Sequence, residues 1–295
     1  RVRPLARSRP VIGSAITVSG GGCRLCGGQA RFVADRGDVV LYRCDVCGLV
    51  SSDPATAQAC AAGYADAYDG PTPAAPGVRY AEWLAFAERT VGRGRLLEVG
   101  AGSGGFVSAA LARGWRVDTT EVSPSALRRL GETGARVFAG DLADARHPAA
   151  AFDLVVCLEV VEHLASPMAH LAELSRVTRP GGLVLLSTPN FDGLSRRLLG
   201  LRWRVIAPEH LSYFTAGALV RALRVAGFAH VDVRSRSLDV TTWSTGAPRR
   251  FDPHAAARLR EAVESTAVLA LVKRTVNTAL GISGLGDSLV AWGRR

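Results

Sequence analysis

Short apolar runs alternate with segments of helical periodicity through residues 78–295. Apolar runs of about four to eight residues between turn-forming positions predict buried strands. The strands expected on this basis cover residues 96–99, 115–121, 152–158, 183–190 (after a turn at 179–182), 231–240 and 287–292. Helices are expected between them, for example at 78–91 and at 215–227, where Thr215 is placed to cap the first turn. This alternation predicts an α/β domain with a mostly parallel sheet covered on both faces.

Two cysteine pairs frame a smaller unit near the start of the sequence. Each pair has the spacing C-x-x-C, and seventeen residues separate the pairs, which are Cys23 with Cys26 and Cys44 with Cys47. Four thiolates at this spacing are typical of a tetrahedral structural zinc site, and short strands are expected at 31–34 and 39–43. Disulfides and a redox-active pair are the alternatives. Because so small a unit buries little core, bound metal would supply much of its folding free energy.

These patterns divide the chain into four parts. They are a tail at residues 1–20, a zinc ribbon at 21–52, a linker rich in Pro, Ala and Gly at 53–77, and the α/β domain at 78–295. Within the α/β domain, a helical insertion is expected at 253–281, and its centre, 266–272, is apolar most of the way round. A buried lid is the favoured interpretation, with a dimer face or a contact with a membrane surface as alternatives.

A glycine-rich turn follows the first strand of the α/β domain. The strand contains an acid, Glu98, and the turn places Gly100, Gly102 and Gly104 before the next helix. Glycines at these positions allow positive φ and let a ligand approach the bare backbone, and the N–H groups at the helix start favour a carboxylate or phosphate. Dinucleotide-binding enzymes use a similar loop, but the last two glycines of their motif are three positions apart instead of two.

Acidic residues recur where the other strands are expected to end. Glu121 lies about 20 residues past the glycine turn, a position from which a carboxylate accepts hydrogen bonds from both hydroxyls of a ribose. Asp141 follows a glycine, and Glu159 follows the apolar run at 152–158. Because parallel strands end at one edge of a sheet, we expect these acids, with Glu98 and Asn190, along a single rim.

The order of these parts resembles the class I S-adenosylmethionine-dependent methyltransferases over residues 78–293. The resemblance implies a Rossmann-like sheet of seven strands, a helical cap over the substrate at 191–210, and S-adenosylmethionine as cofactor. It also implies that Asp141 accepts from the adenine amino group while Leu142 covers the adenine face. The cofactor-binding residues implied in this way are Glu98, Gly100, Ala101, Gly102, Gly104, Glu121, Asp141, Leu142 and Glu159.

Two stretches offer a base for the reaction. Methyl transfer requires donor and acceptor to be held in line, and an acceptor that loses a proton requires a base near the methyl group. Glu159, Glu162 and His163 are spaced i, i+3, i+4, so they would share one face of a helix. The second stretch, Pro-Glu-His-Leu-Ser-Tyr-Phe, contains His210. The candidate catalytic residues are therefore His210, His163 and Glu162, and a structural hydrogen bond in the cap is the alternative for His210.

The same two stretches resemble motifs of narrower families. The Glu-x-x-Glu-His pattern is similar to that of the ubiquinone O-methyltransferases and the small-RNA 3′-end methyltransferases, which implies a Mg²⁺ site completed by His210. The Glu-His-Leu-Ser-Tyr-Phe stretch behind a ribbon resembles the deoxysugar C-methyltransferases of antibiotic pathways, in which the matching histidine deprotonates a carbon beside a ketone. The tyrosine expected three positions before it is Ala207 here, which argues against a ketosugar. These resemblances imply O- or C-methylation of a small hydroxylated or sugar-like metabolite in natural-product or glycan biosynthesis.

Charge keeps a second function open. The net charge is +10 and the pI is near 10, which is typical of nucleic-acid-binding proteins. Some ribosomal-RNA methyltransferases also carry a zinc ribbon before the catalytic domain, so RNA methylation is the alternative function. The arginines are scattered, however, and no mixed aromatic and basic run offers a stacking platform for bases. A small-molecule acceptor is favoured, and nucleic-acid binding is not expected.

Two further expectations concern the setting of the protein. No apolar run approaches the roughly 20 residues that a membrane-spanning helix requires. Paired C-x-x-C motifs and an S-adenosylmethionine site favour the reducing cytoplasm. A homodimer is compatible with the sequence.

Overall fold

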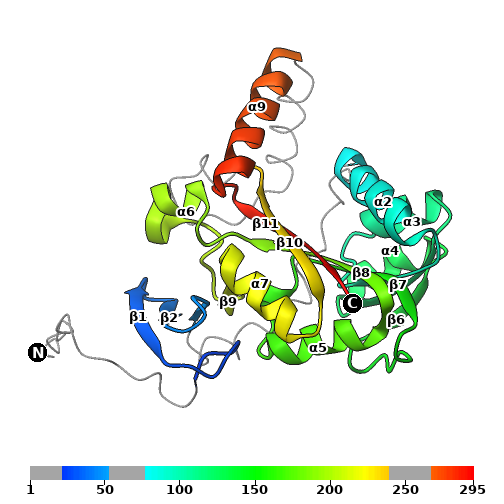
Figure 1. Cartoon of the computed structure of the whole chain (residues 1–295), viewed down its shortest axis with the longest axis horizontal. Helices are drawn as coiled ribbons and strands as arrows, with labels where there is room; N and C mark the ends of the chain where they lie inside the picture. The colour runs from blue at the N-terminus through cyan, green and yellow to red at the C-terminus, as the bar shows by residue number, and fades with distance from the viewer. Residues whose placement is uncertain (1–21, 53–76, 239–266) are drawn as a thin grey trace, which may run out of the picture.

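The computed structural model describes residues 22–52, 77–238 and 267–295. They form a large central sheet and a smaller sheet beside it that carries the cysteine pairs (Figure 1). Within these described ranges, no helix combines the length and the apolar character needed to cross a membrane.

The central sheet confirms the expected seven-stranded, mostly parallel architecture. Its strand order is β10-β11-β8-β7-β4-β5-β6, and only the pairings of β11 with β8 and β10 are antiparallel. The strands are β4 (Arg95–Val99), β5 (Arg116–Glu121), β6 (Arg136–Ala139), β7 (Phe152–Leu158), β8 (Thr178–Pro189), β10 (Ala229–Arg236) and β11 (Ser288–Arg294). Because β4 to β8 run in one direction, the segments that follow them meet at a single edge of the sheet.

Both faces of this sheet are buried because its side chains alternate between two apolar cores. On β4, for example, Leu97 and Val99 pack into one core, whereas Leu96 packs into the other. The first core is covered by α5 (Pro167–Val177) and α7 (Ala216–Val225), and the second by α2 (Gly77–Val91), α3 (Gly105–Ala112) and α4 (Pro124–Leu130). Helix α7 begins as predicted, because Thr215 Oγ1 accepts from the Ala218 N–H at 3.2 Å.

The smaller sheet joins the ribbon to a distant part of the chain. Its strands β1 (Ala30–Asp35), β2 (Val40–Cys44) and β3 (Val50–Ser52) are followed by β9 (Ser212–Tyr213), in the order β1-β2-β3-β9 and antiparallel throughout. The ribbon and the segment before β9 also share an apolar core, formed by Val39, Leu41, Val50, Phe191, Trp203, Ile206 and Tyr213. The ribbon expected to end at residue 52 is therefore packed against the α/β domain and is not a separate unit.

Two helical segments flank the carboxyl edge of the sheet. The segment expected to form a cap contains α6 (Leu194–Leu199) and the 3₁₀ turn η3 (Gly200–Arg202), and its Trp203 is buried at 1% exposure. Helix α9 (Ala267–Ser283) projects away from the body in Figure 1, and Ile282 near its end is 84% exposed. The side chains of the apolar centre at 266–272, on which the interpretation as a buried lid depends, lie outside the described residues, so that interpretation stays a prediction.

Several boundaries differ from those expected. The turn predicted at 179–182 lies inside β8, which starts at Thr178, because Gly181 and Gly182 pair through their backbones with Arg295 at the other end of the described chain. Strand β10 ends at Arg236, four residues before the predicted end. The whole expected tail (1–20), the expected linker (53–77, except residue 77) and part of the helical insertion (253–266) lie outside the described residues.

The helix expected to carry Glu159, Glu162 and His163 is not present. Only the 3₁₀ turn η2 (Val161–His163) forms there, and Glu159 has a positive φ of 54° directly after β7. Because a 3₁₀ turn has a different periodicity and Glu159 lies outside it, the three side chains do not share one helical face.

Candidate active site

The glycine-rich turn joins β4 to α3 and is tightly held by its neighbours. Gly100, Gly102 and Gly104 all have positive φ, between 51° and 75°, which only glycine adopts without strain. A Cβ on Gly100 would lie 2.6 Å from Cγ2 of Val160. The glycine turn is therefore close to the segment after β7, and Ala101 of the turn is buried at 7% exposure.

Glu98 is buried beneath this turn and has an unsatisfied oxygen. Its residue exposure is 3%, and the Val107 N–H at the start of α3 donates to its carboxyl. Burial, together with the charge of Glu121, raises the pKa of Glu98 well above its ordinary value. Among the described residues, Oε2 of Glu98 has no hydrogen-bond partner. A ligand that brings N–H donors or positive charge would satisfy this oxygen.

Glu121 ends β5 and ties the glycine turn to the rim. Its Oε2 accepts from the Gly102 N–H at 2.7 Å, and its Oε1 accepts from the N–H groups of Val122 and Ser123 at 2.7 and 2.8 Å. Oε1 thus has both of its acceptor sites filled, whereas Oε2 keeps a further acceptor site. The side chain therefore holds the loop and retains an acceptor site on Oε2, and the ribose contact stays a prediction.

The other acids predicted to line the rim differ in their surroundings. Asp141 is exposed, and its Oδ1 accepts from the Asp144 N–H at 2.9 Å, whereas Leu142 is buried at 1% exposure. Glu159 accepts from the Ser187 hydroxyl at 2.6 Å. Asn190 lies at the end of β8, but its amide donates to the carbonyls of Gly284 and Gly286. Asn190 is thus committed to a structural contact, while the roles of Asp141, Leu142 and Glu159 remain predictions.

The structure brings together the three predicted catalytic residues although they come from different segments. Glu162 and His163 lie on η2, and His210 lies in the loop before β9. Potential ligand atoms of the three residues lie within 4.8 Å of one another, and the centroids of the two imidazole rings are 4.5 Å apart. We call this set the histidine cluster. Because Val160 touches Gly100, the cluster lies beside the glycine turn.

Backbone carbonyls orient both imidazoles. Nδ1 of His210 is 2.7 Å from the carbonyl oxygen of Val205, and Nδ1 of His163 is 2.9 Å from that of Glu209. Because a carbonyl only accepts, each Nδ1 must carry the proton, which leaves Nε2 as the basic nitrogen of a neutral ring. Burial lowers the pKa of each histidine to about 4. Both rings are therefore neutral at physiological pH and can accept a proton.

Glu162 is the acidic member of the histidine cluster. It is 2% exposed, its Oε2 accepts from the Thr188 hydroxyl at 3.0 Å, and its Oε1 is 4.0 Å from Nε2 of His163. Burial, followed by the nearby Glu159 carboxyl, raises the pKa of Glu162 well above its ordinary value. The hydroxyls of Ser187 and Thr188 were missed in the sequence, because nothing marks a hydroxyl within an apolar strand as a partner of a distant carboxylate.

The four predicted zinc ligands also converge. Their sulfur atoms lie within 4.8 Å of one another, with Cys23 and Cys47 at 3.4 Å and Cys26 and Cys44 at 3.5 Å. Disulfide sulfurs are about 2.05 Å apart, so the four cysteines are free thiols. The N–H groups of Leu25 and Val46 point at Cys23 Sγ and Cys44 Sγ, both at 3.4 Å.

A family described as a methyltransferase domain matches residues 77–233, more than half of the chain. The chain belongs to this methyltransferase family. Over 172 residues it is 34% identical to the malonyl-[acyl-carrier protein] O-methyltransferase of Serratia marcescens, covering 51% of this chain and 67% of that protein. Over 164 residues it is 31% identical to a ubiquinone biosynthesis O-methyltransferase of Cereibacter sphaeroides, covering 51% and 66%. The matched part of this methyltransferase thus spans about two thirds of those relatives.

Known structures show the same fold. A SAM-dependent methyltransferase from Archaeoglobus fulgidus superposes on the methyltransferase with a TM-score of 0.52 at 14% identity, covering 80% of this chain and 99% of the other. The chain is an enzyme that uses S-adenosylmethionine. The orphaned Oε2 of Glu98 and the acceptor capacity of Glu121 Oε2 fit an amino acid joined to a nucleoside.

Proposed function

We propose that the methyltransferase transfers a methyl group to a hydroxyl of a small hydroxylated or sugar-like metabolite, with His210 as the base. The observation that carries this proposal is the histidine cluster beside the glycine turn. Nε2 of His210 is a basic nitrogen on a ring that Val205 orients, and such a base is needed where an acceptor loses its proton.

The reaction is a displacement at carbon. S-adenosylmethionine supplies a methyl group on a positively charged sulfur, which departs as a neutral thioether with the electrons of the broken carbon–sulfur bond. As the acceptor oxygen forms its bond to the methyl carbon, Nε2 of His210 takes the hydroxyl proton. Glu98 and Glu121 hold the cofactor side, and the buried residues of the cap exclude water.

The choice of oxygen as the acceptor atom is supported by two relatives named as O-methyltransferases. Carbon methylation of a ketosugar would use the same base, but Ala207 stands where the deoxysugar enzymes have a tyrosine. The likeness of the His210 stretch and of the ribbon to those enzymes favours an acceptor from natural-product or glycan biosynthesis. A location of the protein in the reducing cytoplasm agrees with the free thiols of the ribbon.

We also propose that the four cysteine thiolates hold a structural zinc ion. The sulfur–sulfur distances of 3.4 and 3.5 Å are close to the roughly 3.8 Å that four Zn–S bonds of about 2.3 Å give in a tetrahedron. Bound zinc would fix the ends of β2 and the turn before β3. It would contribute to folding and take no part in the methyl transfer.

The histidine cluster offers a second cation site, which is an alternative to direct proton transfer. Glu162, His163 and His210 present one carboxylate and two imidazoles, a set that suits Mn²⁺, Fe²⁺ or Zn²⁺ better than Mg²⁺. A cation there would polarise the acceptor hydroxyl. Glu159, the fourth ligand implied by the sequence, is bonded to Ser187 and is not one of the three residues that converge.

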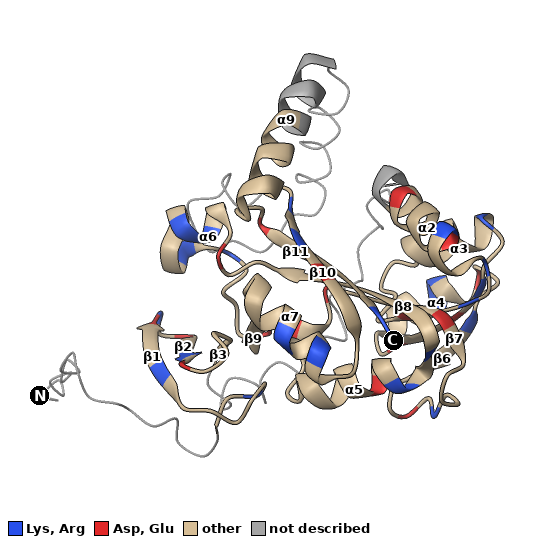
Figure 2. Ribbon diagram, viewed as in Figure 1, with Lys and Arg blue, Asp and Glu red and all other residues tan. Residues whose placement is uncertain are grey.

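A small acceptor is favoured over RNA by the way the charges are arranged. Many arginines of the described residues form ion pairs, among them Arg31–Asp45, Arg36–Asp38, Arg95–Asp118, Arg113–Glu88, Arg176–Glu173 and Arg179–Asp153. Acidic and basic residues are interspersed around α2 and α5, whereas the shorter helices α4, α6 and α7 carry basic residues and no acidic ones (Figure 2). Tight RNA binding that weakens steeply with added salt would support the RNA alternative instead.

The test is turnover with deuterium-labelled S-adenosylmethionine against a panel of hydroxylated aromatics, polyols and nucleotide-linked sugars, followed by mass spectrometry. His210→Asn should lower kcat by about 100- to 10,000-fold, the usual contribution of a positioned base. Its affinity for S-adenosylhomocysteine, measured by calorimetry, should stay within about twofold of the wild type.

His230→Asn, which alters an exposed histidine on β10, is the control and should leave both the kcat and this affinity unchanged. Wild-type turnover in His210→Asn would remove His210 from the chemistry, and labelling of RNA alone would overturn the small-molecule assignment.

For the cation, the zinc-loaded ribbon must stay intact during the assay. Mild chelation that leaves the ribbon zinc in place, followed by addition of Mg²⁺ or Mn²⁺ alone, separates the two metal sites. Recovery of activity that depends on the added cation would assign the histidine cluster to a metal, and full activity without any added cation would assign it to proton transfer.

A further inference from the structure

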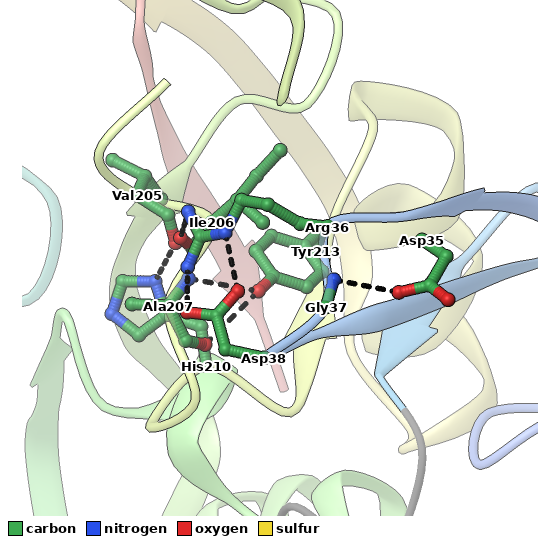
Figure 3. A network of polar contacts seen from close by, with 9 residues as sticks. All are labelled: Asp35, Arg36, Gly37, Asp38, Val205, Ile206, Ala207, His210 and Tyr213. Atoms are coloured by element: carbon green, nitrogen blue, oxygen red, sulfur yellow. Dashed lines mark hydrogen bonds and ion pairs between the residues drawn. The ribbon is translucent and has the colours of Figure 1, made fainter. Parts of the chain in front are cut away.

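The tip of the ribbon hairpin reaches the loop that carries His210. Arg36 lies between β1 and β2, and its Nε and Nη2 donate to the two carboxylate oxygens of Asp38, both at 2.6 Å. The third nitrogen, Nη1, donates to the carbonyl oxygen of Ile206. Figure 3 shows the guanidinium between this carboxylate and this carbonyl. Asp38 thus fixes the plane of the guanidinium, and the remaining donor binds the loop.

The backbone of this loop is held at consecutive carbonyls. The carbonyl of Val205 orients the His210 ring, that of Ile206 accepts from Arg36, and that of Ala207 accepts from the backbone N–H of His210 at 3.0 Å. The hydroxyl of Tyr213 accepts from the Ala207 N–H and donates to the Ala207 carbonyl, at 3.3 and 3.2 Å. Each peptide group between residues 205 and 208 is therefore fixed by at least one hydrogen bond (Figure 3).

These bonds are coupled because peptide units are rigid planes. Two adjacent planes share one α-carbon and turn only through φ and ψ of that residue. The peptide planes that carry the Val205 and Ile206 carbonyls are joined at Ile206, which is fully buried at 0% exposure. If the Ile206 carbonyl lost its donor, the neighbouring carbonyl that orients the His210 ring would gain freedom to turn.

We propose that Arg36 of the ribbon is a positioning residue that fixes the imidazole of His210 through the Ile206 carbonyl. The ribbon would therefore act on the reaction and not only on folding. This inference rests on the proposed role of His210. It adds that a residue outside the methyltransferase family match at 77–233 sets the orientation of the base.

The decisive variants are Arg36→Met, which removes the donors but keeps most of the stem, and Arg36→Lys, which keeps one donor. Arg31→Met is the matched control, since it removes an exposed arginine–aspartate pair from the same hairpin. The readout is the ¹⁵N chemical shifts of the two His210 ring nitrogens, which report whether the proton stays on Nδ1. Zinc content and affinity for S-adenosylhomocysteine are measured on the same samples.

In Arg36→Met, the two His210 nitrogen shifts should move toward each other, because the proton is no longer held on Nδ1 by the Val205 carbonyl. The kcat should fall roughly 10- to 100-fold, the usual cost of a misplaced catalytic group, with the KM for S-adenosylmethionine and the zinc content unchanged. Arg36→Lys should recover part of both effects, and Arg31→Met should show neither. Unchanged His210 shifts in Arg36→Met would overturn the proposal.

Failure of the Arg36 variant to fold and failure of the proposed role of His210 are each distinguished from failure of this proposal. If Arg36→Met does not fold, Asp38→Asn tests the same contact, because it leaves Arg36 in place but loosens its orientation; unchanged His210 shifts in that variant would then overturn the proposal. If His210→Asn keeps wild-type turnover, the proposed role of His210 fails. A shift of its ring nitrogens in Arg36→Met would in that case still show that the ribbon controls the loop.

Discussion

Glu121 holds the glycine turn in addition to its predicted contact with the ribose. Three backbone N–H groups already donate to its carboxylate, so its charge organises the glycine turn before any cofactor is present. The sequence predicted the ribose contact from the position of this acid after β5. It did not predict the bond to Gly102, because a contact between two loops depends on how close their strands lie in the sheet.

We expect Glu121→Gln to weaken binding of S-adenosylhomocysteine by about 10- to 100-fold, since hydrogen bonds to a charged group contribute about 1.5–3 kcal/mol. Calorimetry measures this directly. Asp118→Asn is the control, because Asp118 lies on the same strand but pairs with Arg95 at 2.8 Å. Equal affinity in Glu121→Gln and the wild type would mean that the ribose lies elsewhere.

The histidine cluster was only partly predictable at this scale. The residue types and the two stretches were recognisable, since His163 and His210 each lie beside an acid in a distinctive motif. Their proximity was implied only by the resemblance to families in which a distant histidine completes a metal site, because 46 residues lie between them. The spacing of Glu159, Glu162 and His163 was wrongly interpreted as a helical face. The carbonyls of Val205 and Glu209 that set both tautomers are backbone groups, which every residue has.

At the scale of the elements, the buried strands were the most predictable parts. Strands β4, β5 and β7 start and end within one residue of the expected positions, because β4 and β7 are largely apolar and an acid or a glycine marks the end of all three. Strands β3 and β9 were not expected. They have three and two residues, too short for a period of two to be visible, and each depends on a partner far away in the chain.

A charged contact fastens helix α2 to the end of α3. The carboxylate of Glu88 accepts from Arg113 at 2.7 and 2.8 Å, from Arg93 at 3.2 Å and from Trp115 Nε1 at 3.3 Å. The hydrogen bonds from Arg113 in particular lower the pKa of Glu88 to about 2. Because the folded-state pKa lies below the ordinary value of 4.5, this contribution to stability is complete above about pH 4.5 and is lost as the pH falls through about 2.

Glu88→Gln should therefore lower the Tm at pH 7 by a few degrees, since each kcal/mol corresponds to about 2–4 °C in a domain of this size. The difference from the wild type should shrink between about pH 4.5 and 2, as measured by thermal scans followed by circular dichroism. Glu82→Gln on the same helix is the control. Its ion pair with Arg236 is exposed and 4.0 Å long, so it should have almost no effect. A pH-independent difference in Glu88→Gln would show that charge is not the cause.

At the scale of the whole molecule, the ribbon and the catalytic domain form one unit. Besides the pairing of β3 with β9, Arg24 Nη1 donates to the Leu211 carbonyl at 3.0 Å, and the Ser52 N–H donates to the same carbonyl at 3.1 Å. The sequence predicted the two parts separately, because each has its own motif. Nothing in either motif specifies the surface by which it meets the other.

Loss of the ribbon metal should therefore affect more than the ribbon. We expect Cys44→Ser to reduce bound zinc from one ion per chain to a small fraction, and to lower both the Tm and the turnover, because β2 and β3 support the loop before β9. Metal analysis and activity are measured together. Cys157→Ser is the control: this cysteine is buried on β7, outside the cluster, so zinc content should not change. Full zinc content in Cys44→Ser would contradict the four-thiolate site.

The pairing of β3 with β9 also has a consequence for biosynthesis. Val50 pairs with Tyr213, so the edge of β3 leaves the ribosome long before its partner strand has been made. At 5–20 residues per second, the usual range for translation, the delay is on the order of ten seconds or more. During that interval the cysteines are free to capture metal while the catalytic domain is still being synthesised. If the proposed zinc ion binds in this interval, the ribbon is complete before the His210 loop has been made.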